Sequence, residues 1–331
     1  SPGSKKGADF IFDFGLLQML IESKSSLLKL DAKQQVPNLK STDTFFDNTI
    51  NEAYIQLNSS YEQLKSKVSV PLIKIILLYD EFSNTSVIET SMSKIFEKRA
   101  ADLGIILSDE MKRQFSKYYE MLVEWNKVMN LTGITEYEEV YEKHFLDSIC
   151  IVKAFSEKNI FLSDTTKKVI DIGTGAGFPG IPLKIVFPDM DITLLDSLNK
   201  RINFLNAVIE ELGLSGIDTI HGRAEDYAKN QQHREKYDLC VSRAVANLST
   251  LSEYCVPFLK REGYFISYKS GEVDEELKDA EKALSLLGGK AEKVVKFKIP
   301  ETDIGRSFVI INKIQSTPGK YPRKAGLPSK E

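Results

Sequence analysis

The chain has 331 residues, of which 44 are Lys or Arg and 47 are Asp or Glu, so its formal charge of −3 excludes a strongly basic nucleic-acid coat protein. With 42% hydrophobic and 27% charged residues, the composition excludes wholesale disorder and allows two domains. The three cysteines are too few and too scattered for a disulfide framework or a cysteine-held metal, so we expect a reducing, cytoplasmic protein without a metal site. No apolar run is long enough to span a membrane.

The chain changes in character near Met92. Residues 1–91 contain no Arg, His, Trp or Cys, whereas all four occur from residue 92 onward. Ser, Asn and Thr residues before Met92 are typical of a linker. We therefore predict a remnant of tag cleavage at 1–4, a helical module at 5–82, a linker at 83–91, helices at 92–160, an α/β core at 161–314 and a basic, proline-rich tail at 315–331.

The first module, residues 5–82, is expected to be separate, small and mainly helical. Its apolar residues fall three and four positions apart, as in Ile50, Tyr54 and Leu57. The run 70–82 fits either a helix or a buried strand, and we favour a helix. No residues here have catalytic spacing, so we interpret the module as a binding or carrier domain whose partner is unknown. Its origin, natural or by engineered fusion, stays open.

After the linker the pattern predicts two helical segments. Apolar residues between Met111 and Met129 recur at three and four positions, and Ser108 is placed to cap that helix. The helix is expected to end near Asn130, and a second helical segment spans about 136–155.

Beyond Lys167, apolar strand-like runs alternate with helical stretches. The predicted strands are 169–172, 192–195, 218–220, 239–241 and 263–268. Strands that alternate with helices pair in parallel. The predicted fold class is therefore α/β, with a doubly wound, mostly parallel, Rossmann-like sheet preceded by N-terminal helices.

The most informative segment is DIGTGAGFPG at 171–180, directly after a predicted strand. Its glycines alternate strictly, unlike those of a dinucleotide-binding turn, and no Gly-Lys-Ser or Gly-Lys-Thr follows, which excludes a P-loop. Alternate glycines let a ligand lie against bare backbone. Gly173, Gly175 and Gly177 are therefore candidate ligand-binding residues. Asp171 either organises this loop, which we favour, or contacts the ligand.

Two further strand ends carry acidic residues. Asp196 closes the second strand, where an open α/β sheet places a carboxylate to accept hydrogen bonds from a ribose diol. The alternative for Asp196 is a strand-end cap. Glu225 and Asp226 follow the third strand and are candidates to meet an adenine amino group. Three successive strand ends that are glycine-rich or acidic indicate a nucleoside-binding site.

Several motifs, in order, resemble the bacterial RsmG (GidB) family: WNKVMNLTGIT at 125–135, KHFLDS at 143–148, DIGTGAGFPG at 171–180, LLDSLNKRINFL at 194–205, GRAED at 222–226, SRAVANL at 242–248 and TPGKYPRKAGLP at 317–328. The resemblance covers about 92–330 and leaves 1–91 outside. It implies a class I S-adenosylmethionine-dependent methyltransferase fold. It also implies methylation of guanine N7 in 16S ribosomal RNA, within the small ribosomal subunit or its precursor.

The resemblance implies that S-adenosylmethionine contacts Gly173 and Phe178 in the glycine loop, Ala224 and Glu225 after the third strand, and Arg243 after the fourth. A guanidinium at Arg243 is suited to hold either an RNA phosphate or the cofactor carboxylate. An ordinary surface ion pair is the alternative for Arg243.

Guanine N7 has an in-plane lone pair and loses no proton when it is methylated, so neither a nucleophile nor a general base is required. We expect alignment of the reactants without a covalent intermediate. Cys240 lies within a predicted strand and is expected in the core. His144 and Asp147 are expected to form a hydrogen-bonded pair that supports the site, rather than a metal or proton-transfer site, and Trp125 is expected in the core rather than as a base-stacking platform.

Because the chain is acidic overall, RNA contacts should be concentrated in a few basic clusters. Besides Arg243, the candidates are Lys200 and Arg201 near the second strand and, in the tail, Lys320, Tyr321, Arg323 and Lys324. The alternative for both clusters is a solvated surface.

Two other functions stay open at this point. A small-molecule methyltransferase would share the glycine loop and Asp196 but would not need the basic tail. A non-catalytic RNA- or protein-binding scaffold would use residues 1–91 for recognition.

Overall fold

The computed structural model describes residues 85–158, 167–243, 246–324 and Leu327. The chain divides into two units, Ser1–Lys94 and Ile95–Glu331. The predictions for 1–4, for the helical module at 5–82 and for its run 70–82 lie outside the described residues.

The predicted linker at 83–91 differs from what the structure has there. From Thr85 onward these residues belong to helix α4 (Thr85–Asp102). No Gly or Pro occurs between Thr85 and Asp102, so nothing in the sequence interrupts a helix.

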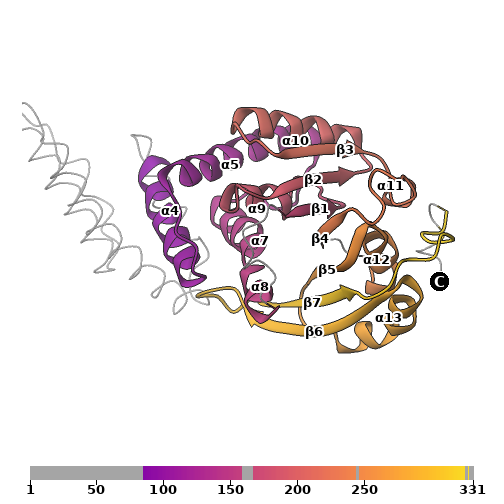
Figure 1. Ribbon diagram of the computed structural model, residues 1–331. Coiled ribbons are helices and arrows are strands. Elements are labelled where there is room, and N and C mark those ends of the chain that lie inside the picture. The colour runs from indigo at the N-terminus through magenta and orange to yellow at the C-terminus, as the bar shows by residue number, and fades with distance from the viewer. Residues whose placement is uncertain (1–84, 159–166, 244–245, 325–326, 328–331) are drawn as a thin grey trace, which may run out of the picture. The chain divides into compact units, whose positions relative to one another are not determined.

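In the described part of the chain, seven strands form one sheet with the order β3-β2-β1-β4-β5-β7-β6 (Figure 1). They are β1 (Lys168–Ile172), β2 (Asp191–Asp196), β3 (Ile217–His221), β4 (Tyr237–Ser242), β5 (Leu259–Lys269), β6 (Gly289–Lys298) and β7 (Gly305–Lys313). Strands β1 to β5 pair in parallel, and β7 lies antiparallel between β5 and β6. The mostly parallel sheet and its five predicted strands are confirmed. The antiparallel pair β6 and β7 was not predicted.

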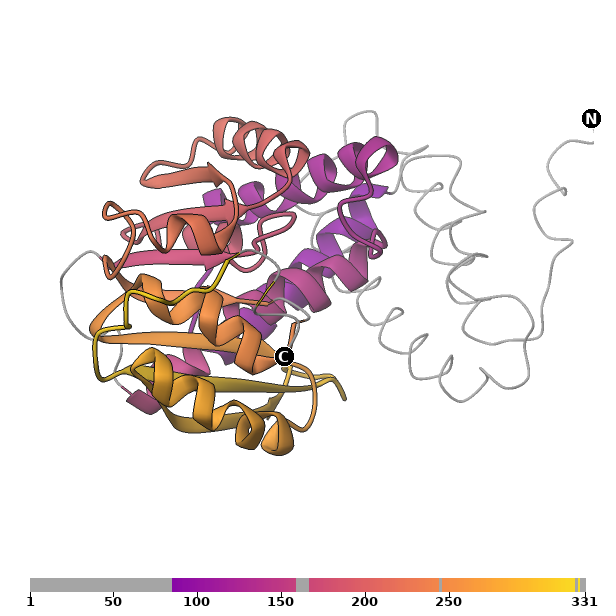
Figure 2. The ribbon, with the colours of Figure 1, turned by 90° about the vertical axis from the view of Figure 1, so that its right-hand side faces the viewer.

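Helices cover both faces of the sheet (Figures 1 and 2). One face carries α9 (Gly180–Val186) and α10 (Asn199–Glu211), and α5 (Asp109–Met129) contacts both of them. The other face carries α11 (Ala224–Tyr227), α12 (Leu248–Cys255), the short helix η2 (Val256–Phe258) and α13 (Asp274–Leu287). This is the doubly wound arrangement that the alternating pattern predicts.

Side-chain alternation along the central strands explains this arrangement. Val169, Leu239 and Val241 face one hydrophobic core cluster, whereas Ile170 and Cys240 face the other. Successive residues of a strand point to opposite sides, so strands that are apolar at every position must be covered on both faces.

The N-terminal helices follow the predicted pattern. The N–H of Met111 donates to Ser108 Oγ at 3.2 Å, which caps α5, and Asn130 ends that helix in the left-handed region at φ 48°. The second predicted helical segment consists of α6 (Tyr137–Val140), a π-helical turn η1 (Tyr141–Leu146), α7 (Asp147–Ile149) and α8 (Val152–Lys158). The π-helical turn has no signal in the sequence, and such turns occur frequently at functional sites.

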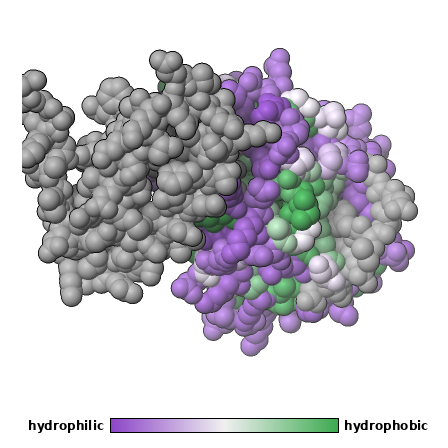
Figure 3. Space-filling view, turned by 90° about the vertical axis from the view of Figure 1, so that its left-hand side faces the viewer, coloured by the Kyte–Doolittle hydropathy of each residue, from purple (hydrophilic) through white to green (hydrophobic). Residues whose placement is uncertain are grey.

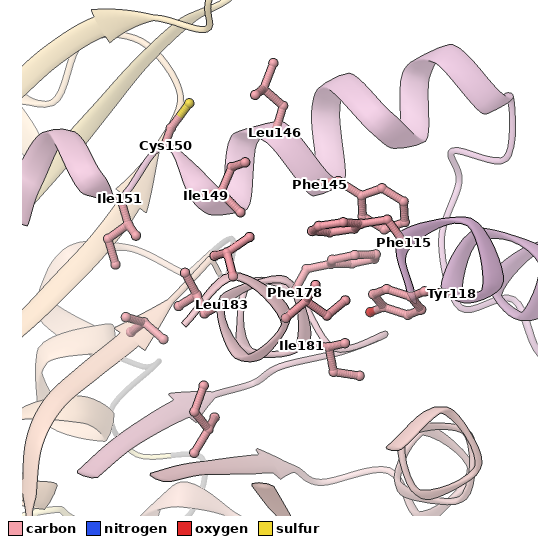
Figure 4. Packing of buried hydrophobic residues seen from close by; sticks show 14 of the residues in the cluster. Phe115, Tyr118, Phe145, Leu146, Ile149, Cys150, Ile151, Phe178, Ile181 and Leu183 are labelled. Carbon is pink, nitrogen blue, oxygen red and sulfur yellow. The ribbon is translucent and has the colours of Figure 1, made fainter. Parts of the chain in front are cut away.

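An aromatic cluster joins these helices to the glycine loop (Figure 4). The ring of Tyr118 on α5 stacks against Phe145 and against Phe178, with centroids 5.3 Å apart in both pairs. The Tyr118 hydroxyl also donates to the carbonyl oxygen of Ala176 within the loop. The helical layer thereby fixes the position of the loop that follows β1.

The face in Figure 3 shows hydrophilic residues around a smaller hydrophobic area. Among the described helices, none combines the length and the hydropathy needed to cross a membrane. The described residues also contain no cluster of His, Cys, Asp and Glu suited to a metal ion.

Candidate functional site

The glycine loop leaves β1 at its carboxyl end. Gly173, Gly175 and Gly177 all have positive φ, at 70°, 65° and 97°. L-residues with a side chain rarely adopt these angles, which explains the alternate glycines. A Cβ added at Gly175 would meet only the carbonyl oxygen of Gly173, at 4.0 Å, so the loop presents bare backbone there.

Asp171 stabilises this loop through two hydrogen bonds. Its Oδ2 accepts hydrogen bonds from Thr174 Oγ1 at 2.7 Å and from the N–H of Gly180 at 2.9 Å. The other oxygen, Oδ1, is buried and has no partner in the described part of the chain. Burial raises the pKa of Asp171 to about 6. Asp171 therefore organises the loop, as favoured from the sequence.

Asp196 joins the end of β2 to the same loop. Its Oδ2 accepts from the N–H of Gly175 at 3.0 Å and from Arg201 Nη1 at 3.2 Å, and its Oδ1 accepts from the N–H of Leu198 at 2.9 Å. The side chain is 2% exposed. Arg201 was predicted to contact RNA. It forms an ion pair with Asp196, the residue proposed to bind a ribose.

The third strand end completes a row of three. The N–H of Gly222, directly after β3, donates to the backbone carbonyl of Asp196 at 3.0 Å. A Cβ at Gly222 would fall 2.2 Å from Tyr227 Cε2, so a larger residue here would require the Tyr227 ring to shift. Ala224 and Glu225 begin α11 and are both buried. The structure thus brings the predicted residues of β1, β2 and β3 to one edge of the sheet.

Arg243, directly after β4, contacts the π-helical turn. Its Nη1 donates to the Lys143 carbonyl and to Asp147 Oδ2, each at 3.1 Å, and its Nη2 donates to His144 Nδ1 at 3.2 Å. The guanidinium carbon also lies 5.1 Å from the centroid of the Phe178 ring. Arg243 is therefore a partly buried bridge between β4, the helical layer and the glycine loop, and not an ordinary surface ion pair.

His144 and Asp147 were predicted to bond to each other, and this was wrong. Both side chains bond Arg243 instead, His144 from the π-helical turn and Asp147 from the start of α7 directly after it. The His144 ring stacks on Phe178 at 4.5 Å. Burial and then the Arg243 charge lower the pKa of His144 to about 3, so its imidazole is neutral at physiological pH.

Two residues of this network were not singled out from the sequence. Thr132 Oγ1 lies 2.9 Å from His144 Nε2, and Arg306 Nε donates to Asp147 Oδ1 at 2.8 Å. Thr132 lies in NLTGIT at 130–135, part of a motif that resembles the RsmG family, and this motif could have identified it from the sequence. Arg306 has no such signal, because β7 was not predicted.

The remaining basic candidates lie on the surface in different settings. Lys200 is exposed and donates to the Met129 carbonyl at 3.0 Å. Lys320 and Lys324 in the tail are exposed. Tyr321 packs beside a core cluster, with Lys320 Nζ 5.2 Å from its ring centroid.

Arg323 differs from its neighbours in the tail. Its Nη2 donates to Glu253 Oε2 at 2.8 Å and its Nε to both Glu253 oxygens, at 3.1 and 3.0 Å. Glu253 is 4% exposed. Arg323 therefore docks the tail onto α12 by neutralising a buried carboxylate.

Of the residues expected in the core, Cys240 is buried and Trp125 is partly buried. Cys240 is buried and forms no disulfide, and the same holds for the two other cysteines. Burial raises the pKa of the Cys240 thiol well above its ordinary value, so this thiol is no nucleophile. Trp125 packs against the core, with its ring centroid 5.6 Å from that of Phe204.

Comparison with known proteins agrees with this architecture. Residues 111–305 match the family described as GidB, rRNA small subunit methyltransferase G. Two proteins named ribosomal RNA small subunit methyltransferase G are similar to this chain. The one from Lachnoclostridium phytofermentans is 54% identical over 228 residues, covering 69% of this chain and 92% of the relative. The one from Desulforamulus reducens is 51% identical over 235 residues, covering 71% and 95%.

Among solved structures, the crystal structure of M. jannaschii TYW2 in complex with AdoMet is similar at 15% identity, covering 49% of this chain and 76% of that one, with a TM-score of 0.37. This similarity is too low to bear on function. The family match and the identity to the two relatives, each matched over more than nine-tenths of its length, are decisive: this chain belongs to the rRNA small subunit methyltransferase G (GidB) family.

Proposed function

We propose that this chain transfers a methyl group from S-adenosylmethionine to N7 of a guanine in 16S ribosomal RNA, within the small ribosomal subunit or its precursor. The observation that carries the proposal is the meeting of the glycine loop, Asp196 and Arg243 along the carboxyl edge of β1, β2 and β4. Ligands of open α/β sheets bind at this edge. The family membership supplies the substrate class.

The residues at this edge fit S-adenosylmethionine. Gly173 is exposed, and a Cβ added at Gly175 would meet no side chain within 4 Å, so both leave backbone uncovered. Asp196 Oδ1 accepts a single hydrogen bond from the described residues, from Leu198, so a lone pair remains for a ribose hydroxyl. In the proposal, Phe178, Ala224 and Glu225 also border the cofactor, together with Gly177 in the loop.

S-adenosylmethionine, when bound, supplies an electrophilic methyl group on its sulfonium centre. The chain then has to hold the acceptor atom in line with that methyl group and exclude water. No proton needs to leave guanine N7. This fits the described residues around the strand ends, because His144 is neutral and hydrogen-bonded and Cys240 is buried with a raised pKa. These features support the proposed catalysis by alignment, without a covalent enzyme intermediate.

Contact with RNA is proposed at few positions. Arg243 and Arg306 share the single carboxylate of Asp147, so this group of three side chains carries one net positive charge. Exposed Lys200, Lys320 and Lys324 add phosphate-binding charge. Arg201 pairs with Asp196 and Arg323 pairs with Glu253. We propose that these two ion pairs hold the RNA-binding surface in place and that Tyr321 lies beside it.

The experiment is a transfer assay with the full chain, methyl-labelled S-adenosylmethionine and unmethylated small ribosomal subunits, followed by RNA digestion and mass spectrometry of the nucleosides. Labelled 7-methylguanosine is expected. A different labelled nucleoside would refute the N7 assignment. Cofactor binding without any labelled nucleoside would favour a small-molecule methyltransferase or a non-catalytic scaffold instead.

The mechanism has its own test. The same assay is stopped with denaturant and the protein is separated under conditions that preserve covalent bonds to RNA. No protein–RNA adduct is expected at any time point. A trapped adduct that forms before product would overturn catalysis by alignment.

A further inference from the structure

A directional chain of hydrogen bonds runs from Arg243 through His144 to Thr132. A guanidinium can only donate hydrogen bonds. Because Arg243 Nη2 lies 3.2 Å from His144 Nδ1, that ring nitrogen must be the acceptor. The neutral imidazole then carries its hydrogen on Nε2, which lies 2.9 Å from Thr132 Oγ1. In this tautomer, which the contact with Arg243 favours, His144 donates to Thr132.

The Thr132 hydroxyl receives a second hydrogen bond. The backbone N–H of Ile134 donates to Thr132 Oγ1 at 3.1 Å. A hydroxyl oxygen has two acceptor lone pairs and one hydrogen to donate. Both lone pairs are used by His144 and Ile134, and within the described residues Oγ1 donates to no other group. The hydroxyl hydrogen of Thr132, on a half-buried side chain, is therefore left to donate, and the two accepted hydrogen bonds fix its direction.

Thr132 is held in place by Asn126 and is linked to the glycine loop through His144. Asn126 Oδ1 accepts from the N–H of Leu131 at 2.6 Å and of Thr132 at 2.9 Å, so the turn after α5 cannot rotate freely. His144, which orients the hydroxyl, stacks on Phe178 at 4.5 Å. The donor is therefore preorganised at the boundary between the helical layer and the loop that would hold the methyl donor.

We propose that the Thr132 hydroxyl is a specificity-determining group that donates a hydrogen bond to O6 of the target guanine; this rests on the proposed function. Guanine presents two acceptors side by side on this edge, N7 and O6, whereas adenine presents N7 beside an amino donor. A hydroxyl that can only donate accepts guanine and rejects adenine. It does so without touching N7, which stays available to the methyl group.

The test uses the full chain and small subunits in which the target guanine, located by the transfer assay, is replaced by 2-aminopurine, which lacks O6. The enzyme variants are Thr132→Val, which removes the hydroxyl at nearly constant volume, and Thr132→Ser as the matched control that keeps it. kcat/KM for methyl transfer is measured for each enzyme on each RNA. Binding of S-adenosylmethionine is measured in parallel and is expected to stay within about threefold in both variants, because Thr132 does not line the proposed cofactor site.

The expected result is coupling between Thr132 and O6. Loss of one neutral hydrogen bond lowers kcat/KM by roughly ten- to a hundredfold, either when O6 is removed or when Thr132→Val removes the donor. On the 2-aminopurine RNA, Thr132→Val should cause less than about threefold further loss. Thr132→Ser should stay within about threefold of the unsubstituted chain on guanine.

Two results would overturn the inference. The first is an equal loss for Thr132→Val on both RNAs, which would assign Thr132 a structural role only. The second needs no variant: equal kcat/KM of the unsubstituted chain on guanine and on 2-aminopurine would show that O6 is not read. If the unsubstituted chain forms no 7-methylguanosine, the proposed function fails, and this inference fails with it.

Discussion

The substitution Gly177→Ala tests how the glycine loop is built. Gly177 has φ 97°, and a Cβ there would lie 2.6 Å from Ile181 Cδ1 and 2.6 Å from the Tyr118 hydroxyl oxygen. Tyr118 is fully buried, so it has little room to move. The left-handed conformation costs an L-residue about 1–2 kcal/mol, and forcing a methyl group into a filled core costs about 1–3 kcal/mol. We expect Gly177→Ala to lower the free energy of unfolding by about 2–5 kcal/mol.

Gly175→Ala is the matched control. Gly175 has φ 65°, but an added Cβ meets only the Gly173 carbonyl oxygen at 4.0 Å. This variant carries the backbone strain without the clash, so we expect a loss of about 1–2 kcal/mol. The difference between the two variants isolates the cost of the contacts with Ile181 and Tyr118.

The assay is urea unfolding followed by tryptophan fluorescence. Trp125 is the only tryptophan in the chain and packs against Phe204 in the second unit, so its emission reports on that unit. The midpoint for Gly177→Ala should lie clearly below that for Gly175→Ala. Equal midpoints would refute the packing argument, because they would mean that the loop is free to move away from Tyr118.

Three further predictions follow from the ion pairs and the buried acid. Because burial raises the pKa of Asp171 from 3.8 to about 6, its contribution to stability is present below pH 4 and is lost as pH rises to about 6. Asp171→Asn should flatten that part of the profile of thermal unfolding against pH, and an unchanged profile would contradict the assignment. Arg323→Ala should destabilise the chain by about 2–3 kcal/mol, since it leaves the Glu253 carboxylate buried without its cation, and by less when Glu253→Gln is added; both are measured by urea unfolding. Lys320→Ala should reduce the slope of log affinity for 16S RNA against log salt by about 1. Lys296→Ala should leave that slope unchanged, because the Lys296 ammonium is already paired with two carboxylates. Equal slopes for the two variants would contradict a contact between Lys320 and RNA.

The sequence predicts those parts of the fold and site that are local in the chain. The five parallel strands are short apolar runs, and the glycine loop and Asp196 follow them directly, so their position at the sheet edge needs no tertiary information. Strand β6 was not predicted because its exposed lysines Lys290, Lys293 and Lys296 interrupt the apolar run that the other predicted strands have. Strand β7 is apolar but follows a hairpin connection, which breaks the alternation of strand and helix.

The interactions that the sequence does not reveal are those between distant residues. Arg243 and Asp147 are separated by 96 positions, and their contact depends on a π-helical turn that has no sequence signal. The same holds for Arg201, whose charge suggests RNA until its ion pair with Asp196 is seen. A basic side chain near a sheet edge can face either the ligand or the protein, and only packing decides between them.

The most direct test of the central claim is chemical mapping of the modified base in the RNA. Small subunits that lack the modification are incubated with the full chain and S-adenosylmethionine. The 16S RNA is then extracted, treated with borohydride and aniline, which cleave RNA at 7-methylguanosine, and read by primer extension. We predict one new cleavage, at a guanine, that requires both the chain and the cofactor. Methyl incorporation without any cleavage would place the methyl group on another atom and contradict guanine N7 methylation.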